Sequence, residues 1–253
     1  MSPWIETSQT PLSRGPILLL GPDSKIQRIL VQELHSLPAT TMTALDFEDA
    51  TRRLAEASHP PSVLLLPEKE IIPDEFEEQL SALRIRTRSP SLVPIAFGRS
   101  PDAERRQALR EAGLRLALFG RFGRHALRFQ VNRALSRWAT RKPRGEIRAP
   151  KEWRTRSFSS GRIKAVRCYS LSSGGAYFVT PRPWVVGSDV SLELPIGRKR
   201  LLVQGRILYT NAAGAGDSRT LPRGMAITFR PLGDRVQKAI RADVHRTQAS
   251  LEV

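Results

Sequence analysis

Few side chains in this sequence of 253 residues could do covalent chemistry. There is one cysteine, Cys168, and the four histidines stand far apart. One cysteine cannot form an internal disulfide, and a structural zinc site needs several Cys or His ligands at close spacing. No nucleophile pattern or glycine-rich phosphate loop accompanies His125, which we interpret as a helix-start residue. The sequence therefore predicts a protein that is not an enzyme and holds no metal or cofactor.

Arginine dominates the remaining chemistry. The chain has 41 Lys and Arg against 24 Asp and Glu, a net charge of +17, and the charge is unevenly spread. Residues 43–79 hold 10 acidic and 3 basic side chains, whereas residues 102–148 hold 13 basic and 4 acidic ones. A basic surface attracts nucleic acid, anionic lipid or a phosphorylated ligand. A solvated arginine-rich surface with no partner is the alternative.

The first half of the chain alternates short apolar runs with amphipathic stretches, which is typical of βα units around a parallel sheet. The apolar runs predict five strands, at residues 17–20, 40–45, 63–66, 93–97 and 114–119. The amphipathic stretches predict helices at residues 24–37, 46–57, 73–83, 100–113 and 125–136. We expect a (βα)5 domain of the α/β class over residues 15–139.

Helical spacing disappears after residue 141, and short β-rich segments follow a basic linker at residues 140–144. Six strands are predicted, at residues 153–158, 162–169, 176–180, 189–194, 201–209 and 225–229, with a loop at 211–219. A last helix from Asp234 carries Val236, Ile240 and Val244 on one face and could cover one end of a small barrel. We expect an all-β domain over residues 140–250, built as a six-stranded β-barrel with a C-terminal helix.

The first domain resembles the flavodoxin-like receiver domain of response regulators, most closely in the segment EAGLRLALFGRFGRHALRFQVNRAL. Receivers phosphorylate an aspartate beside a magnesium ion held by an acidic pair, with a hydroxyl residue and a lysine nearby. The matching positions carry Gly21 and Pro22 for the acidic pair, Pro67 for the aspartate, Gly98 or Arg99 for the hydroxyl, and Gly120 and Arg121 for the Lys-Pro pair. The resemblance implies a receiver fold that cannot be phosphorylated and is kept for binding.

The basic face of this domain is the candidate partner surface. It would gather Arg105, Arg106 and Arg110 with Arg124, Arg128 and Arg133, and would suit an acidic protein partner. Solvated helical faces without a partner are the alternative. A displaced metal site made of Asp23, Glu68 and Glu70 is a further alternative, which we rank below a solvated loop.

Two motifs in the second half resemble those of PilZ domains, small barrels through which many bacterial proteins sense cyclic di-GMP. The family's Arg-x-x-x-Arg stands here as Arg144-Gly-Glu-Ile-Arg148. The family's Asp/Asn-x-Ser-x-x-Gly stands as Ser170-Leu-Ser172-Ser-Gly-Gly175, and GMAITF at residues 224–229 resembles a later strand. The resemblance implies a cyclic di-GMP site formed by Arg144, Arg148, Ser170, Ser172 and Gly175.

The implied ligand fits these side chains chemically. Guanidinium groups can bind phosphate oxygens or guanine O6 and N7 and can stack on a purine, while a serine and a glycine-rich turn offer donors and close backbone approach. Ser170 departs from the family, and its short hydroxyl cannot replace a bidentate contact to guanine, a loss of about 1 to 3 kcal/mol. A plain β-turn that binds no nucleotide is therefore the alternative.

The patterns and the two resemblances together predict a bacterial signalling adaptor or effector that acts through protein contacts. The family resemblance implies a role in motility, polarity or surface-polysaccharide control. The alternative is a PilZ scaffold that does not bind cyclic di-GMP because of Ser170. Nucleic-acid binding is disfavoured, because no helix-turn-helix pattern is present and aromatic residues make up only 6% of the chain. No apolar run approaches the roughly 20 residues that span a bilayer, and no signal segment is seen, so we expect no transmembrane segment and a cytoplasmic location.

Overall fold

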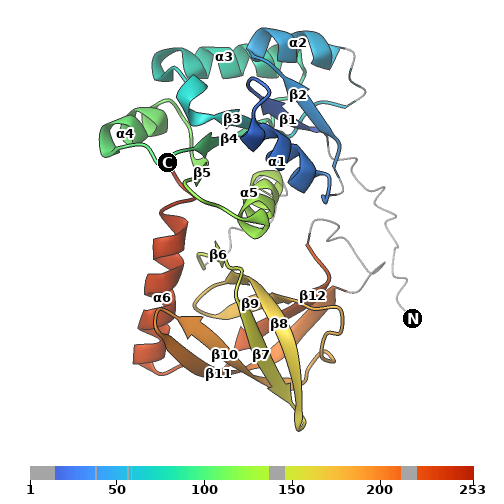
Figure 1. Ribbon diagram of the computed structural model, residues 1–253, viewed down its shortest axis with the longest axis vertical. Coiled ribbons are helices and arrows are strands. Elements are labelled where there is room, and N and C mark those ends of the chain that lie inside the picture. The colour runs from blue at the N-terminus through green and yellow to red at the C-terminus, as the bar shows by residue number, and fades with distance from the viewer. Residues whose placement is uncertain (1–14, 38, 56, 58, 137–145, 212–220) are drawn as a thin grey trace, which may run out of the picture.

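Two domains lie one above the other along the long axis of the computed structural model (Figure 1). The structure describes residues 15–37, 39–55, 57, 59–136, 146–211 and 221–253. The predicted fold classes are confirmed: the first domain is an α/β sheet domain, and the second is an antiparallel barrel with a C-terminal helix. The predicted linker at 140–144 lies outside the described residues.

A five-stranded parallel sheet forms the centre of the first domain. Its strands are β1 (Ile17–Leu20), β2 (Thr41–Ala44), β3 (Val63–Pro67), β4 (Val93–Gly98) and β5 (Leu116–Phe119). They lie in the order β2-β1-β3-β4-β5, the order of a receiver fold, and each falls within two residues of its predicted bounds. Every residue of β1 and β5 is buried because helices cover both faces of the sheet, which explains the continuous apolar runs.

Helices on the two faces of this sheet enclose two separate apolar clusters. The helices are α1 (Lys25–Leu34), α2 (Phe47–Ala55), α3 (Pro73–Arg86), α4 (Ala103–Glu111) and α5 (Arg124–Ser136), with a short 3₁₀ helix η1 (Glu68–Glu70). Helices α2, α3 and α4 pack on one face, and α1 and α5 pack on the other. Ser24 and Asp102 cap α1 and α4 by accepting hydrogen bonds from backbone N–H groups in the first turn.

The second domain is a closed antiparallel barrel. Its six strands are β7 (Arg154–Ser159), β8 (Arg162–Leu171), β9 (Gly175–Val179), β10 (Asp189–Ile196), β11 (Lys199–Asn211) and β12 (Gly224–Phe229), and pairing of β8 with β9 closes the ring. Helix α6 (Asp234–Gln248) packs Ile240 and Val244 into the barrel core, as predicted. Of the predicted loop at 211–219, Asn211 ends β11 and the rest lies outside the described residues.

Two features were not predicted. A two-residue strand, β6 (Ala149–Pro150), pairs with β8 beside the barrel. The chain after α6 also returns to the first domain, where Ala117 N–H donates to the Leu251 carbonyl (3.0 Å) and Phe119 N–H donates to the Ser250 carbonyl (3.2 Å). This segment, residues 249–253, which we call the C-terminal strap, therefore continues the first sheet beyond its edge strand β5.

Candidate functional site

The end of the linker and the serine-glycine turn lie side by side. Strand β6 pairs antiparallel with β8, so that Pro150 stands opposite Ser170. Arg148 directly precedes β6, and the turn at residues 172–174 directly follows β8. The structure therefore brings Arg148 close to the turn, although the two are distant in sequence. Arg144 lies outside the described residues.

A carboxylate already occupies the donors of this turn. Ser173 Oγ donates to Glu146 Oε1 (3.2 Å), and Gly174 N–H donates to Glu146 Oε2 (3.0 Å). A Cβ at Gly174 would lie 2.7 Å from Glu146 Oε1, so a larger residue here would displace the Glu146 carboxylate from its present position. The turn therefore holds an anionic group with one hydroxyl and one backbone N–H. Our sequence analysis missed Glu146, although it stands between the two motif arginines.

The other predicted site residues shape the turn from inside. Ser172 is fully buried, and both its N–H (2.8 Å) and its Oγ (3.2 Å) donate to the Gly175 carbonyl. A Cβ at Gly175 would lie 2.3 Å from the Ile227 carbonyl oxygen, so β9 can approach β12 only with glycine at this position. Ser170 is also buried, within β8. These residues fix the direction in which Ser173 and Gly174 present their donors.

The same strand also contacts the first domain. The Tyr169 ring meets the His125 ring edge to face, with 5.3 Å between the centroids, and Tyr169 OH accepts a hydrogen bond from Asn132 Nδ2 (3.1 Å). Burial raises the pKa of Tyr169 to about 12. His125 is the second residue of α5, and its Nδ1 lies 2.9 Å from the Lys151 carbonyl oxygen. The candidate site is therefore one residue away from the domain interface.

The positions that carry phosphorylation in receivers are packed together here. Gly21 and Pro67 stand at the carboxyl ends of β1 and β3, next to each other in the sheet. Gly21 has a φ of 115°, and a Cβ on it would lie 2.8 Å from Pro67 Cγ. Gly98 and Gly120 follow the same edge at β4 and β5. Backbone and a proline ring thus take the place of the carboxylates, the hydroxyl and the lysine.

The three carboxylates considered as a displaced metal site do not share one. Asp23 Oδ1 lies 3.6 Å from Arg28 Nε, and Glu70 Oε1 lies 3.2 Å from Lys69 Nζ. Glu68 Oε1 forms an ion pair with Arg105 Nε at 2.8 Å. Within the part of the chain that the structure describes, no group of three or more His, Cys, Asp or Glu residues could hold a metal ion.

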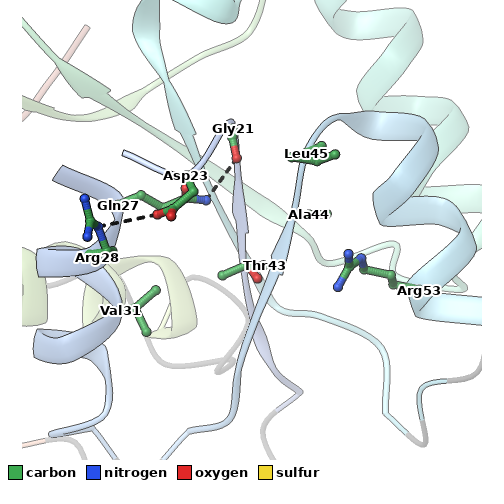
Figure 2. Close-up of a pocket in the computed structure, with 9 residues that line it drawn as sticks. All are labelled: Gly21, Asp23, Gln27, Arg28, Val31, Thr43, Ala44, Leu45 and Arg53. Atoms are coloured by element: carbon green, nitrogen blue, oxygen red, sulfur yellow. Dashed lines mark hydrogen bonds and ion pairs between the residues drawn. The ribbon is translucent and has the colours of Figure 1, made fainter. Parts of the chain in front are cut away.

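An open pocket of about 330 Å³ lies between the carboxyl ends of β1 and β2 and helix α1 (Figure 2). Gln27 donates across it to the Gly21 carbonyl (3.0 Å), and Arg28, Arg53 and Asp23 line its rim. Its only lining carboxylate, Asp23, faces Arg28. No base stands beside a nucleophile among the residues that line this pocket. The pocket lies in the first domain, whereas the PilZ-like motif residues lie in the barrel domain.

The predicted arginine surface makes contacts within the chain. Arg106 Nη1 donates to the Ala249 carbonyl (2.8 Å), and Arg110 Nε donates to the Val253 carbonyl (2.9 Å). Arg105 instead pairs with Glu68. The remaining arginines are also engaged within the chain: Arg124 pairs with Glu33, Arg128 donates to the Ser36 carbonyl, and Arg133 pairs with Glu252. Docking of an acidic partner here stays a prediction, and the C-terminal strap would compete with it.

No family model matches the sequence, and no curated protein sequence is similar to it. Among solved structures, the receiver domain of an HD domain-containing protein from Pseudomonas fluorescens is 23% identical, with a TM-score of 0.40 over 51% of this chain and 99% of that one. The PilZ domain of Escherichia coli YcgR with c-di-GMP is 14% identical (TM-score 0.34, 43% of this chain, 93% of that one). The inhibitor of motility MotI/DgrA of Bacillus subtilis is 15% identical (TM-score 0.35, 43% of this chain, 53% of that one).

These similarities concern the fold. The order and direction of the strands define the class of fold: a receiver-like α/β domain is followed by a closed six-stranded antiparallel barrel with a C-terminal helix. No helix among the described residues is long and apolar enough to cross a lipid bilayer.

Proposed function

We propose that this protein is a non-enzymatic bacterial signalling adaptor whose barrel binds cyclic di-GMP and which acts through protein contacts of its receiver-like domain. The processes that fit this role are motility, cell polarity and surface-polysaccharide control. The proposal rests on the two PilZ-like motifs and on one observation about the turn that follows β8.

That observation is the anionic group held by the turn. Ser173 Oγ and Gly174 N–H both donate to the Glu146 carboxylate, so the turn presents donors to a negatively charged oxygen. Arg148 stands next to this turn across the β6–β8 pair. An arginine in the chain segment next to two such donors suits a phosphate of a cyclic dinucleotide, whose guanines also offer acceptors to arginine.

Ligand binding at the turn could affect the first domain through the contacts between the two domains. Tyr169 precedes Ser170 in β8 and meets His125 and Asn132 of α5. A ligand that changes the position of the linker end or of the turn would therefore act on contacts with the first domain. Signalling of this kind needs no chemical reaction.

The alternative is a scaffold that binds no nucleotide. The observation that favours it is Ser170, which is buried in β8 and is shorter than the Asp or Asn of PilZ domains. In that case the turn would hold Glu146 permanently and the two domains would keep one arrangement.

Calorimetric titration of the full chain with cyclic di-GMP tests the proposal. We expect saturable binding, and we expect Arg148→Ala to weaken it by on the order of 1.5 to 3 kcal/mol because a charge-assisted contact is lost. Arg154→Ala is the matched control, since Arg154 is an exposed arginine of β7, outside both motifs, and should bind like the wild type.

Ser170→Asn separates the two functions. If only Ser170→Asn binds, the site is intact apart from one contact and the natural protein is a scaffold. If neither the wild type nor this variant binds while both keep their thermal midpoint, Arg148 is an ordinary linker charge and the ligand assignment is wrong.

A further inference from the structure

The end of the barrel that points away from the first domain combines exposed apolar side chains with arginines. In Figure 1 the turn between β7 and β8 lies at this end. The loop at residues 181–188 joins it there, because Lys164 Nζ donates to the Arg182 carbonyl (3.1 Å). The same loop contacts β11, where Gly187 N–H donates to the Ile207 carbonyl (2.9 Å). We call this surface the distal end of the barrel.

The distal end exposes four large aliphatic side chains. Val185 is 78% exposed, and each of the others is more than half exposed: Ile163, Val186 and Leu208. The loop that carries the two valines is fixed by the preceding residue, because Trp184 is buried and its Nε1 donates to Ser157 Oγ (3.0 Å). The anchored Trp184 therefore keeps both valine side chains exposed to water. Exposure of apolar surface is unfavourable in free energy, and burial in an apolar medium would remove this penalty.

The same surface is positively charged. Arg162, Lys164, Arg182 and Arg206 stand there, and no ion pair among the described residues includes Arg162 or Arg182. The nearby carboxylate, Asp189, is held by Arg230 at 2.8 Å. Burial, and then the charges of Arg162 and Arg182, lower the pKa of Lys164, as expected where cations crowd together.

We propose that the distal end of the barrel binds the surface of an anionic phospholipid membrane. Arg162 and Arg182 would contact headgroup phosphates, and the exposed aliphatic side chains would enter the boundary between headgroups and acyl chains. These residues come from three separate chain segments, the β7–β8 turn, the loop at residues 181–188 and β11, which fits a planar partner better than a peptide. The proposal does not depend on cyclic di-GMP binding.

Sedimentation of the full chain with vesicles tests this inference. The probe is phosphatidylcholine vesicles containing about 30% phosphatidylglycerol, with pure phosphatidylcholine vesicles for comparison. We expect the wild type to bind only the anionic vesicles. The double variant Arg162→Glu/Arg182→Glu should lower the partition coefficient at least about tenfold, from the attraction of each cation to the surface.

The control must account for the net charge of +17, which alone attracts anionic lipid. Arg198→Glu/Lys199→Glu makes the same change of charge in the exposed turn between β10 and β11, at the opposite end of these strands from Arg206. This variant should lose far less binding. An equal loss in both double variants would show unspecific attraction, and absence of binding by the wild type would leave an acidic protein as the partner; either result overturns the proposal.

The apolar contribution has its own test. Val185→Ser/Val186→Ser removes the aliphatic contact without changing charge, so it should weaken vesicle binding several-fold at about 0.3 M salt, where exposed charges are screened. Thermal midpoints must stay close to that of the wild type in all three variants. Binding by the valine variant that equals the wild type at this salt concentration contradicts insertion of the loop.

Discussion

The carboxylate of Glu146 accepts hydrogen bonds from Ser173 and Gly174, the donors to which we propose that cyclic di-GMP binds. A phosphate approaching the turn must displace this carboxylate or bear its repulsion. We expect Glu146→Gln to raise the affinity for cyclic di-GMP several-fold, measured by calorimetry at one salt concentration.

A matched control is Glu152→Gln, which removes a carboxylate that accepts the His125 N–H (3.0 Å) rather than the donors of the turn. It should leave the affinity nearly unchanged. A fall in affinity for Glu146→Gln would mean that Glu146 contacts the ligand itself, for example as an acceptor from guanine N–H groups.

Tyr169 gives the molecule a stability that depends on pH. Burial raises its pKa from 10.0 to about 12 in the folded protein, so folding favours the neutral phenol. This contribution is complete below pH 10 and is lost as the pH rises towards 12, up to about 2 to 3 kcal/mol. Denaturant unfolding across this range should show a steeper fall for the wild type than for Tyr169→Phe, and equal slopes would contradict the assignment.

Among the elements, the C-terminal strap connects the end of α6 to the sheet of the first domain. Leu251 is 3% exposed and packs with α5 and β5 residues of the first domain. We expect Leu251→Asp to cost about 3 kcal/mol, because it places a charge in an apolar cluster. Scanning calorimetry should then show two separate transitions in place of one.

Ile85→Asp is the control for this prediction. Ile85 also belongs to the first domain but is 78% exposed, so the same type of change should shift stability by less than about 0.5 kcal/mol. A single transition for Leu251→Asp, at the temperature of the wild type, would show that the strap does not couple the domains.

Local sequence patterns predicted most of these elements. The five sheet strands were found because parallel strands covered on both faces are continuous apolar runs, and the barrel strands because turn residues separate them. Strand β6 was missed because two residues that include Pro150 form no pattern. The strap was missed for a related reason: its pairing with β5 depends on contacts between residues far apart in the chain.

The candidate site was predictable only in part. Arg148, Ser172 and Gly175 follow family motifs, and the structure gathers them around one turn. The role of Glu146 could not be predicted, since it depends on how the linker end folds over the turn rather than on residue type. The arginine surface shows the same limit, because nothing in the sequence indicates that Arg106 and Arg110 bind carbonyl groups of the strap.

At the scale of the whole molecule, we expect that small phosphoryl donors do not phosphorylate the first domain. Incubation with acetyl phosphate or beryllofluoride and Mg²⁺ should leave the mass and the thermal midpoint unchanged, because Gly21 and Pro67 stand where receivers carry carboxylates and Arg105 pairs with Glu68. A receiver that keeps its aspartate serves as the positive control. A stable Mg²⁺-dependent adduct on residues 15–139 would contradict this expectation.

The strap also has a consequence for how the chain folds. The hydrogen bonds from Ala117 to Leu251 and from Phe119 to Ser250 join the β5 edge to residues that follow the whole barrel and α6 in the chain, so we expect this edge to be completed late in folding. Contacts of such long sequence separation slow folding, because the loop between them must be closed first. Refolding experiments should therefore show the first domain assembling early with an unprotected β5 edge, and amide protection at Ala117 and Phe119 appearing in a later phase together with that of the barrel.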